Sequence, residues 1–303
     1  MKTIKHLPIA AVALMSVAAH AAIGQTTGAL NAASVASGKE FRQQAQGKYV
    51  QVNGLKMYYE VHGTGKPLLL LHGAFGTVEA WAPLLPGLVK GRQVITVELQ
   101  GHGRTADIDR PLSYSNMADD VAELLKQLKL KDVNVFGYSM GGDTAFALAI
   151  KYPELVHKLA TLGSGTGSTK DTYDPETYKQ FKSITPENFN FPVLKDPYTK
   201  VAPDPSKWPV LVAKIIKMDD DFKGFPAKDV KSIKAQTLIM MGDRDVVRME
   251  HAVEVYRMIP GSQLAVFPGG DHFAIFASPD LVVATLVKFL DAPASGSQAG
   301  GGK

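Results

Sequence analysis

Six short apolar runs constrain the fold of this 303-residue chain more than any other feature. They read PLLLLHG, QVITVELQGHG, VNVFGYS, KLATLG, TLIMMGDRD and QLAVFPGG. Runs this short and this continuously apolar are typical of parallel strands that are buried on both faces. Apolar residues at helical spacing lie between or after the runs, over residues 115–130, 141–152, 249–259 and 281–290.

A different pattern precedes these runs. The segment YVQVNGLKMYYEV alternates apolar and polar residues around Asn53-Gly54, which is a signal for a two-residue hairpin turn. Strands that alternate with helices indicate a parallel sheet covered on both faces. We therefore predict an α/β fold: a mostly parallel, doubly wound sheet that begins with an antiparallel hairpin.

The alternation stops once, over residues 168–234. This segment is rich in Pro and aromatic residues, has no clear strand, and is too long for an ordinary connection. We interpret it as an inserted, largely helical cap. The predicted division of the chain is a signal peptide (1–21), a flexible arm (22–47), a core (48–167 and 235–290), the cap (168–234) and a flexible tail (291–303).

The first residues predict export. Lys2 and Lys5 precede an apolar run that ends near Ala19-His20-Ala21, which is a small-x-small cleavage pattern. The run is shorter than the roughly 20 residues that a bilayer span needs. We expect cleavage near Ala21, a periplasmic or secreted mature protein, and no stable membrane anchor after the leader is removed.

Charge and composition exclude several classes of function. The formal net charge of +4 includes Lys2 and Lys5, so it falls by two, to +2, without the leader. Nucleic acid is therefore not expected as a partner. The chain has no Cys, which excludes disulfides, thiolate metal sites and a cysteine nucleophile. No paired His at helical spacing or calcium-loop pattern is present, so we predict no metal and no cofactor, and we interpret MDDDF at 218–222 as a solvated acidic face.

The stretch VNVFGYSMGGDTAFALAI places one serine, Ser139, at a glycine-rich corner between a strand and a helix. Such a corner forces the serine into a strained conformation and exposes its hydroxyl above the carboxyl edge of the sheet. The pattern Gly-x-Ser-x-Gly also occurs by chance. Its position between an apolar run and a helical run makes Ser139 a candidate nucleophile.

A serine hydroxyl needs a base, and only His titrates near neutral pH without help. His272 follows the last predicted strand, after Gly269-Gly270, and is our candidate. The orienting carboxylate is expected after the preceding strand, where Asp243 and Asp245 compete. We favour Asp245, because Gly242 and Asp243 fit the turn itself.

An acyl-transfer site also needs backbone donors for the oxyanion. The predicted donors are the N–H of Met140, at the start of the helix after Ser139, and the N–H of Ala74, in the loop after the PLLLLHG run. The predicted pocket lining is Phe75, Tyr138 and Phe273.

Together these segments resemble the α/β-hydrolase superfamily, over about residues 49–290. The resemblance rests on five segments: His72-Gly73, Gly101-His102-Gly103-Arg104-Thr105, Gly137-Tyr138-Ser139-Met140-Gly141-Gly142, Gly242-Asp243-Arg244-Asp245 and Gly270-Asp271-His272. It implies that Ala74 is an oxyanion donor, that Asp245 completes a Ser-His-Asp triad, and that a cap follows the sixth strand. Glu98 departs from it, since many members of the family carry Asp there.

A serine at the corner argues against the haloalkane dehalogenases and epoxide hydrolases of this superfamily, which carry Asp. We therefore expect a hydrolase that cleaves an ester of a small-molecule substrate through an acyl-enzyme. A carbon–carbon bond hydrolase, a lactonase or a perhydrolase uses the same parts. A non-catalytic binding protein of the same fold is a third alternative. The motifs leave the natural substrate and the oligomeric state open.

Overall fold

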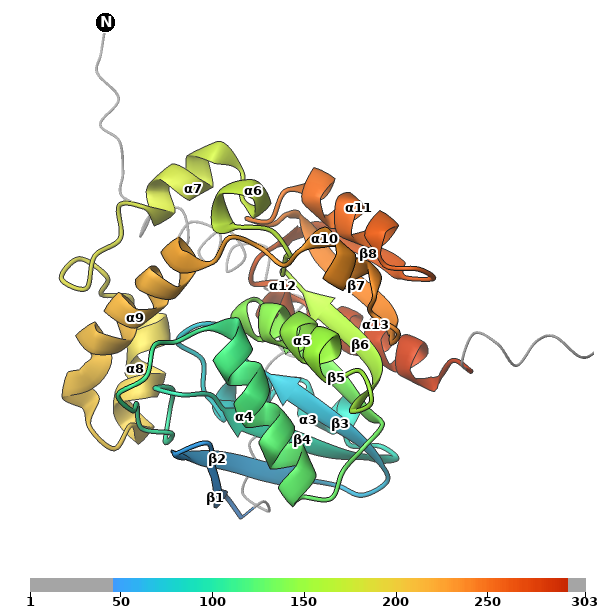
Figure 1. Ribbon diagram of the computed structural model, residues 1–303, viewed down its shortest axis with the longest axis horizontal. Helices are drawn as coiled ribbons and strands as arrows, with labels where there is room; N and C mark the ends of the chain where they lie inside the picture. The colour runs from blue at the N-terminus through green and yellow to red at the C-terminus, as the bar shows by residue number, and fades with distance from the viewer. Residues whose placement is uncertain (1–45, 294–303) are drawn as a thin grey trace, which may run out of the picture.

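The computed structural model describes residues 46–293, which form an eight-stranded sheet with helices on both faces (Figure 1). The strands are β1 (Lys48–Val52), β2 (Leu55–His62), β3 (Lys66–Leu71), β4 (Arg92–Glu98), β5 (Val133–Tyr138), β6 (Val156–Leu162), β7 (Gln236–Arg244) and β8 (Gln263–Asp271). Their order across the sheet is β1-β2-β4-β3-β5-β6-β7-β8. The pairs β1–β2 and β2–β4 are antiparallel and the remaining pairs are parallel, so the predicted fold class is confirmed.

The helical elements in the described part of the chain differ in length. They are η1 (Val78–Trp81), α3 (Leu85–Leu88), α4 (Tyr114–Gln127), α5 (Met140–Lys151), α6 (Thr169–Thr172), α7 (Pro175–Phe181), α8 (Pro192–Val201), η2 (Pro205–Lys207), α9 (Trp208–Asp221), α10 (Ala227–Lys231), α11 (Met249–Met258), α12 (Ala274–Ala277) and α13 (Pro279–Asp291). The predicted helix at 115–130 extends too far. It ends as α4 at Gln127, because Lys129 has a positive φ of 57°, which an α-helix does not contain.

The hairpin begins the sheet as predicted. Asn53 and Gly54 both have positive φ angles, 47° and 82°, and Val52 pairs with Leu55 across the turn. Positive φ at both central residues is the geometry of the tight turn whose twist matches that of two antiparallel strands.

The strand runs are continuously apolar because each face of the sheet has its own core. In β3, Leu69 and Leu71 pack in the cluster that includes α4 and α5, whereas Leu68 and Leu70 pack in the cluster that includes α3 and α13. All four side chains are fully buried. This arrangement leaves the carboxyl edge of the sheet as the place where polar side chains can gather.

The segment between β6 and β7 contains α6–α10 and η2, and Figure 1 shows α6–α9 grouped beside the sheet. The segment packs on the loops that follow β3 and β4: Phe189, between α7 and α8, contacts Phe75, and Lys214 Nζ of α9 donates to the carbonyl of Ile108. The acidic stretch at 218–222 is not entirely the solvated face that we predicted. Asp220 and Asp221 are exposed, but Asp219 faces inward and accepts from the hydroxyl of Tyr114.

The predicted leader, most of the arm and most of the tail lie outside the described residues. Within residues 46–293, no helix is long and apolar enough to cross a membrane.

Candidate active site

Ser139 lies at the turn between β5 and α5. Its φ and ψ angles are 53° and −125°, a combination that costs a non-glycine residue about 1–3 kcal/mol. Hydrogen bonds on both sides stabilise the turn: the Ser139 N–H donates to the carbonyl of Leu162 (2.9 Å), and the N–H of Gly142 donates to the carbonyl of Ser139 (2.7 Å). The strained conformation predicted from the sequence is present.

The glycines around Ser139 permit close backbone approach. A Cβ atom on Gly137 would overlap the carbonyl of Gly141, and one on Gly141 would overlap the carbonyl of Leu71. Any larger residue at either position would therefore separate α5 from β5 or from β3. This is the physical reason why glycines flank the serine.

Three side chains from different loops form a continuous hydrogen-bonded chain. His272 Nε2 lies 3.0 Å from Ser139 Oγ, and His272 Nδ1 lies 2.8 Å from Asp245 Oδ1. With a proton on Nδ1, the ring donates to Asp245 and its free Nε2 accepts from the serine hydroxyl. This is the arrangement that a general base beside a nucleophile requires.

The pKa of His272 reflects two opposing effects. Burial lowers it, but the charge of Asp245 and the hydrogen bond to that carboxylate raise it more, so the pKa lies above its ordinary value. The Asp245 side chain is fully buried and that of His272 is 16% exposed. A fully buried carboxylate beside the imidazole stabilises the imidazolium ion that forms when the ring accepts a proton.

The other two aspartates near His272 occupy different positions. Asp243 is exposed at the end of β7, whereas Asp245 contacts the imidazole. Asp271 Oδ1 accepts from the N–H of Phe273 (2.8 Å), a local contact within the loop that carries His272. The contact with His272 therefore belongs to Asp245.

The loop after β3 passes directly beside Ser139. A Cβ atom on Gly73 would lie 3.2 Å from the Cβ of Ser139, and β3 pairs with β5 as far as Leu71 and Gly137. The structure thus brings Ala74, the residue after Gly73, and Met140, the residue after Ser139, to the same edge of the sheet. The buried His72 fixes the base of this loop, because its Nε2 accepts from the N–H of Leu99 (3.1 Å).

The three predicted pocket residues have different environments. Phe75 is buried against the cap, while Phe273 is half-buried with its ring edge-on to His272 at 6.0 Å. Tyr138 is 7% exposed and packs in the core, and its hydroxyl donates to the carbonyl of His272 (3.0 Å). Tyr138 therefore stabilises the His272 loop from the side of the core.

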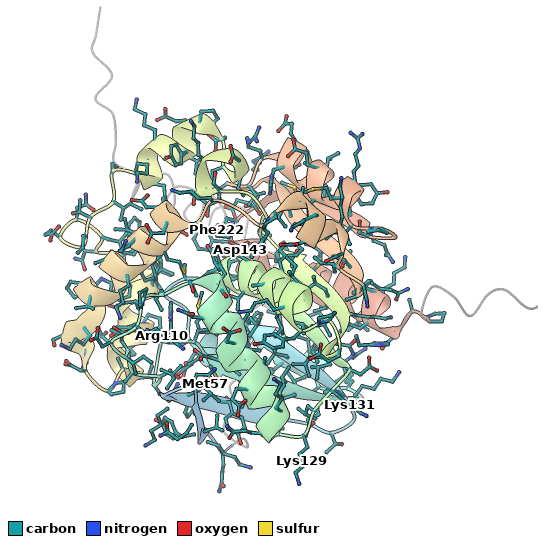
Figure 2. All side chains as sticks on the ribbon, in the orientation of Figure 1. Met57, Arg110, Lys129, Lys131, Asp143 and Phe222 are labelled. Carbon is teal, nitrogen blue, oxygen red and sulfur yellow. The ribbon has the colours of Figure 1, made fainter. Side chains whose placement is uncertain are left out.

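Sequence reasoning missed a pair of carboxyl groups beside this site. Asp143, in the first turn of α5, accepts from the N–H of Gly165 (2.9 Å), and Tyr114 donates to Asp219 (3.0 Å) and also lies against Asp143. Burial raises the pKa of each carboxyl group to about 7. Figure 2 labels Asp143 at the end of α5, and Phe222, whose ring packs on Tyr114. No sequence signal connects these residues, because cap and core meet there only after folding.

Gly163 was also missed. It follows β6 with a φ of 62°, and a Cβ atom at this position would lie 2.9 Å from His272 Nδ1 and 3.1 Å from Asp245 Oδ2. A side chain there would push the imidazole and the carboxylate apart. The glycine after the KLATLG run was the available signal.

Glu98, where the sequence departs from the family pattern, has a structural role. Its fully buried carboxylate accepts from the N–H of Val78 (3.2 Å) and from the guanidinium of Arg104 (2.7 Å). Burial raises the pKa of Glu98 to about 7. The contacts connect the end of β4 to η1, which follows the loop that contains Ala74.

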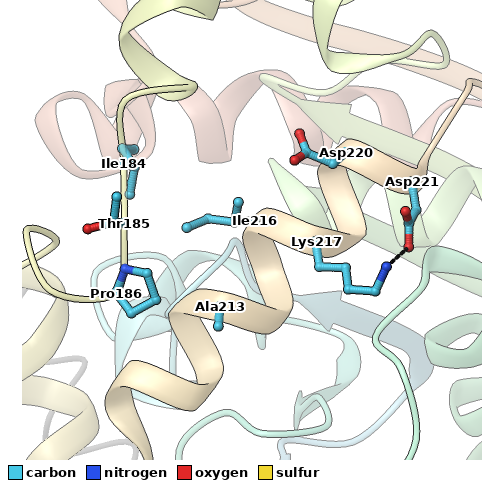
Figure 3. A pocket seen from close by; sticks show the side chains of 8 residues that line it. All are labelled: Ile184, Thr185, Pro186, Ala213, Ile216, Lys217, Asp220 and Asp221. Atoms are coloured by element: carbon cyan, nitrogen blue, oxygen red, sulfur yellow. Dashed lines mark hydrogen bonds and ion pairs between the residues drawn. The ribbon is translucent and has the colours of Figure 1, made fainter.

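A separate pocket of about 370 Å³ lies in the cap, between residues 184–186 and α9 (Figure 3). Apolar side chains such as Ile184 and Ile216 line it, and Lys217 forms an ion pair with Asp221 at its edge. None of its lining residues belongs to the hydrogen-bonded chain of Ser139. Among residues 46–293, no group of three or more His, Asp or Glu side chains could hold a metal ion.

Comparison with known proteins agrees with this architecture. The family model for the alpha/beta hydrolase fold matches residues 66–234. The chain belongs to the α/β-hydrolase fold family. Serine hydrolase BPHL from Homo sapiens is 30% identical to this α/β hydrolase over 240 residues, which cover 74% of this chain and 79% of that protein.

Solved structures share the fold at lower identity. The carboxylesterase CesB from Bacillus subtilis is 18% identical with a TM-score of 0.65, and the match covers 87% of this chain and 98% of that chain. The enol-lactonase from Burkholderia xenovorans LB400 is 20% identical with a TM-score of 0.63, and the match covers 81% of this chain and all of that one (100%).

Proposed function

We propose that this α/β hydrolase is a serine esterase that cleaves small to medium apolar esters through a Ser139-His272-Asp245 triad. The observation that carries the proposal is the continuous chain from Asp245 through His272 to Ser139, with distances of 2.8 and 3.0 Å. Its likeness to a serine hydrolase and a carboxylesterase is consistent with this reaction.

The proposed reaction uses these three side chains in turn. Ser139 Oγ attacks the ester carbonyl carbon while His272 Nε2 accepts its proton, and the Asp245 carboxylate stabilises the imidazolium. The carbonyl oxygen becomes an oxyanion, to which the N–H groups of Ala74 and Met140 donate. The tetrahedral intermediate expels the alcohol, which takes the proton from His272. Water, deprotonated by the same nitrogen, then attacks the acyl-enzyme, and the acid is released as His272 returns the proton to Ser139 Oγ.

Aromatic side chains support the choice of an apolar substrate. Phe75, next to Ala74, packs with Phe189 and Trp208 of the cap at ring distances of 4.7 and 5.1 Å. An aromatic enclosure near the reacting carbonyl favours short acyl or aryl groups over long chains, which need an open groove.

The proposal is tested with a fluorophosphonate probe and a panel of substrates. Wild type is expected to be labelled and to hydrolyse short-chain chromogenic esters, and Ser139→Ala is expected to do neither. Equal labelling of both proteins would contradict Ser139 as the nucleophile, and a wild type that is neither labelled nor active would favour a non-catalytic binding protein. The panel includes a lactone and a diketone, since faster turnover of either would favour a lactonase or a carbon–carbon bond hydrolase.

We also propose that the protein is exported, on the basis of the charged, apolar and small-residue pattern of residues 1–21. N-terminal sequencing of the periplasmic protein is expected to begin near Ala22. An intact Met1 in that material would contradict export with cleavage.

A further inference from the structure

The turn beside Ser139 contains a backbone conformation that its own sequence does not favour. The N–H of Gly76 donates to the carbonyl of Gly73 (3.0 Å), and Phe75, the third residue of this turn, has a φ of 64°. This region of φ favours glycine or asparagine and costs a bulky residue about 1–3 kcal/mol. Contacts outside the turn must therefore stabilise Phe75 in this conformation.

Those contacts come from the cap. Phe75 is only 9% exposed, and its ring lies 4.7 Å from that of Phe189 and 5.1 Å from that of Trp208. Trp208 Nε1 donates to the carbonyl of Phe189 (3.1 Å), and the two rings are stacked within 15° of parallel. Phe189 and Trp208, the cap pair, thus form one rigid aromatic surface against Phe75.

The position of the turn links the cap pair to the reaction. Gly73 approaches Ser139 closely, and Ala74, the proposed oxyanion donor, lies between Gly73 and Phe75. Peptide groups are planar, so a return of Phe75 to a negative φ would turn over the peptide that joins it to Ala74. That change would reverse the direction of the Ala74 carbonyl and the Phe75 N–H, and so alter the peptide dipoles beside the Ala74 N–H and Ser139.

We propose that Phe189 and Trp208 are positioning residues for catalysis: by packing on Phe75 they maintain the orientation of the Ala74–Phe75 peptide, which lies next to the Ala74 N–H, the proposed oxyanion donor. This inference rests on the proposed esterase function. Because the oxyanion forms only in the transition state, loss of the cap pair affects kcat more than substrate binding. A cap that served only as a pocket wall would instead affect KM.

The test compares Trp208→Leu with the conservative Trp208→Phe and with Phe181→Leu, a cap aromatic that contacts Tyr173 and not Phe75. Trp208→Leu is expected to lower kcat about 10- to 100-fold and to change KM by less than about threefold. Trp208→Leu is also expected to weaken the binding of an aryl trifluoromethyl ketone, which forms an oxyanion when Ser139 adds to it. The binding of the matching inert amide, which forms no oxyanion, is expected to stay unchanged. Trp208→Phe and Phe181→Leu are expected to retain most of the activity. A rise in KM alone would overturn the proposal.

A second background separates positioning from simple destabilisation. Glycine adopts a φ near 64° without a steric penalty, so a Phe75→Gly protein no longer depends on the cap pair. In that background, Trp208→Leu is expected to change kcat by less than about twofold. Losses of equal size in both backgrounds would overturn the proposal.

A structure gives a readout that does not depend on activity. A crystal structure of Trp208→Leu is expected to show Phe75 at a negative φ, and an unchanged φ would overturn the proposal even if activity fell. Failure of the esterase function itself would be seen separately, as a wild-type protein that does not hydrolyse esters.

Discussion

Replacement of Asp143 by asparagine tests the electrostatics beside the site. The Asp143 carboxyl group has a raised pKa because it is buried and because Asp219 lies near it. The Tyr114 hydroxyl, which contacts both carboxyl groups, has one proton and can donate to only one of them at a time. Asparagine keeps the oxygen that accepts from the N–H of Gly165 and removes the ionisable group.

The magnitude follows from the pKa of about 7 in the folded protein. An unfolded aspartate has a pKa of about 4, so between these values the folded state binds a proton that the unfolded state has lost. The contribution of Asp143 to the free energy of unfolding is therefore greatest below pH 4. It decreases by about 1.4 kcal/mol per pH unit as the pH rises to about 7. An asparagine side chain does not titrate and has no such dependence. Relative to wild type, the free energy of unfolding of Asp143→Asn is expected to rise by about 3 kcal/mol between pH 5 and pH 8.

Urea denaturation of both proteins at pH 5, 6, 7 and 8 measures this difference, and Asp196→Asn, an exposed aspartate in α8, is the control. A second readout is the pH dependence of kcat/KM. Asp143 contributes to the raised pKa of His272. The acid limb of the kcat/KM profile is therefore expected to move to lower pH in Asp143→Asn. Parallel stability curves for wild type and Asp143→Asn would refute the reasoning.

Four further outcomes are expected. Asp245→Asn lowers kcat about 10⁴-fold, whereas the exposed Asp243→Asn retains activity; the reverse order in ester assays would reassign the acid. In wild type, kcat/KM increases with pH as His272 loses its proton, with a midpoint above the ordinary histidine value, and Asp245→Asn lowers that midpoint. Glu98→Ala costs about 1–3 kcal/mol in urea denaturation, because it leaves the N–H groups of Val78 and Arg104 without their acceptor, although Arg104 keeps its ion pair with Glu79. Short-chain or aryl esters react faster than emulsified long-chain triglycerides, and the opposite rate order would contradict our interpretation of the cap.

The core of the fold was predictable from local patterns. A strand such as β3 is apolar at every inner position because both faces of the sheet are covered, and this shows directly in the sequence as LLLL. The hairpin turn at Asn53-Gly54 was equally visible, because few residues adopt two successive positive φ angles. The end of α4 was not predicted, since the left-handed conformation of Lys129 has no signal in residue type.

The meeting of Ser139, Asp245 and His272 was also predictable, for a topological reason. Parallel strands end at the same edge of a sheet, so residues that follow β5, β7 and β8 lie near one another once the strand order is known. The sequence favoured Asp245 over Asp243 because Gly242 and Asp243 fit the turn, and the contact of Asp245 with His272 agrees with that choice.

Two of the features that sequence reasoning missed lie where the cap meets the core. Asp143 and Asp219 are on α5 and α9, and only the packing of the cap on α4 brings Tyr114 between them. Phe75 was expected in the pocket, but its positive φ depends on cap rings far away in the sequence. Local sequence patterns do not predict such contacts, because the two partners come from segments that are far apart in the sequence. Under the proposed function, substitutions in the cap are therefore expected to alter selectivity and oxyanion binding together while the contacts of His272 with Ser139 and Asp245 remain.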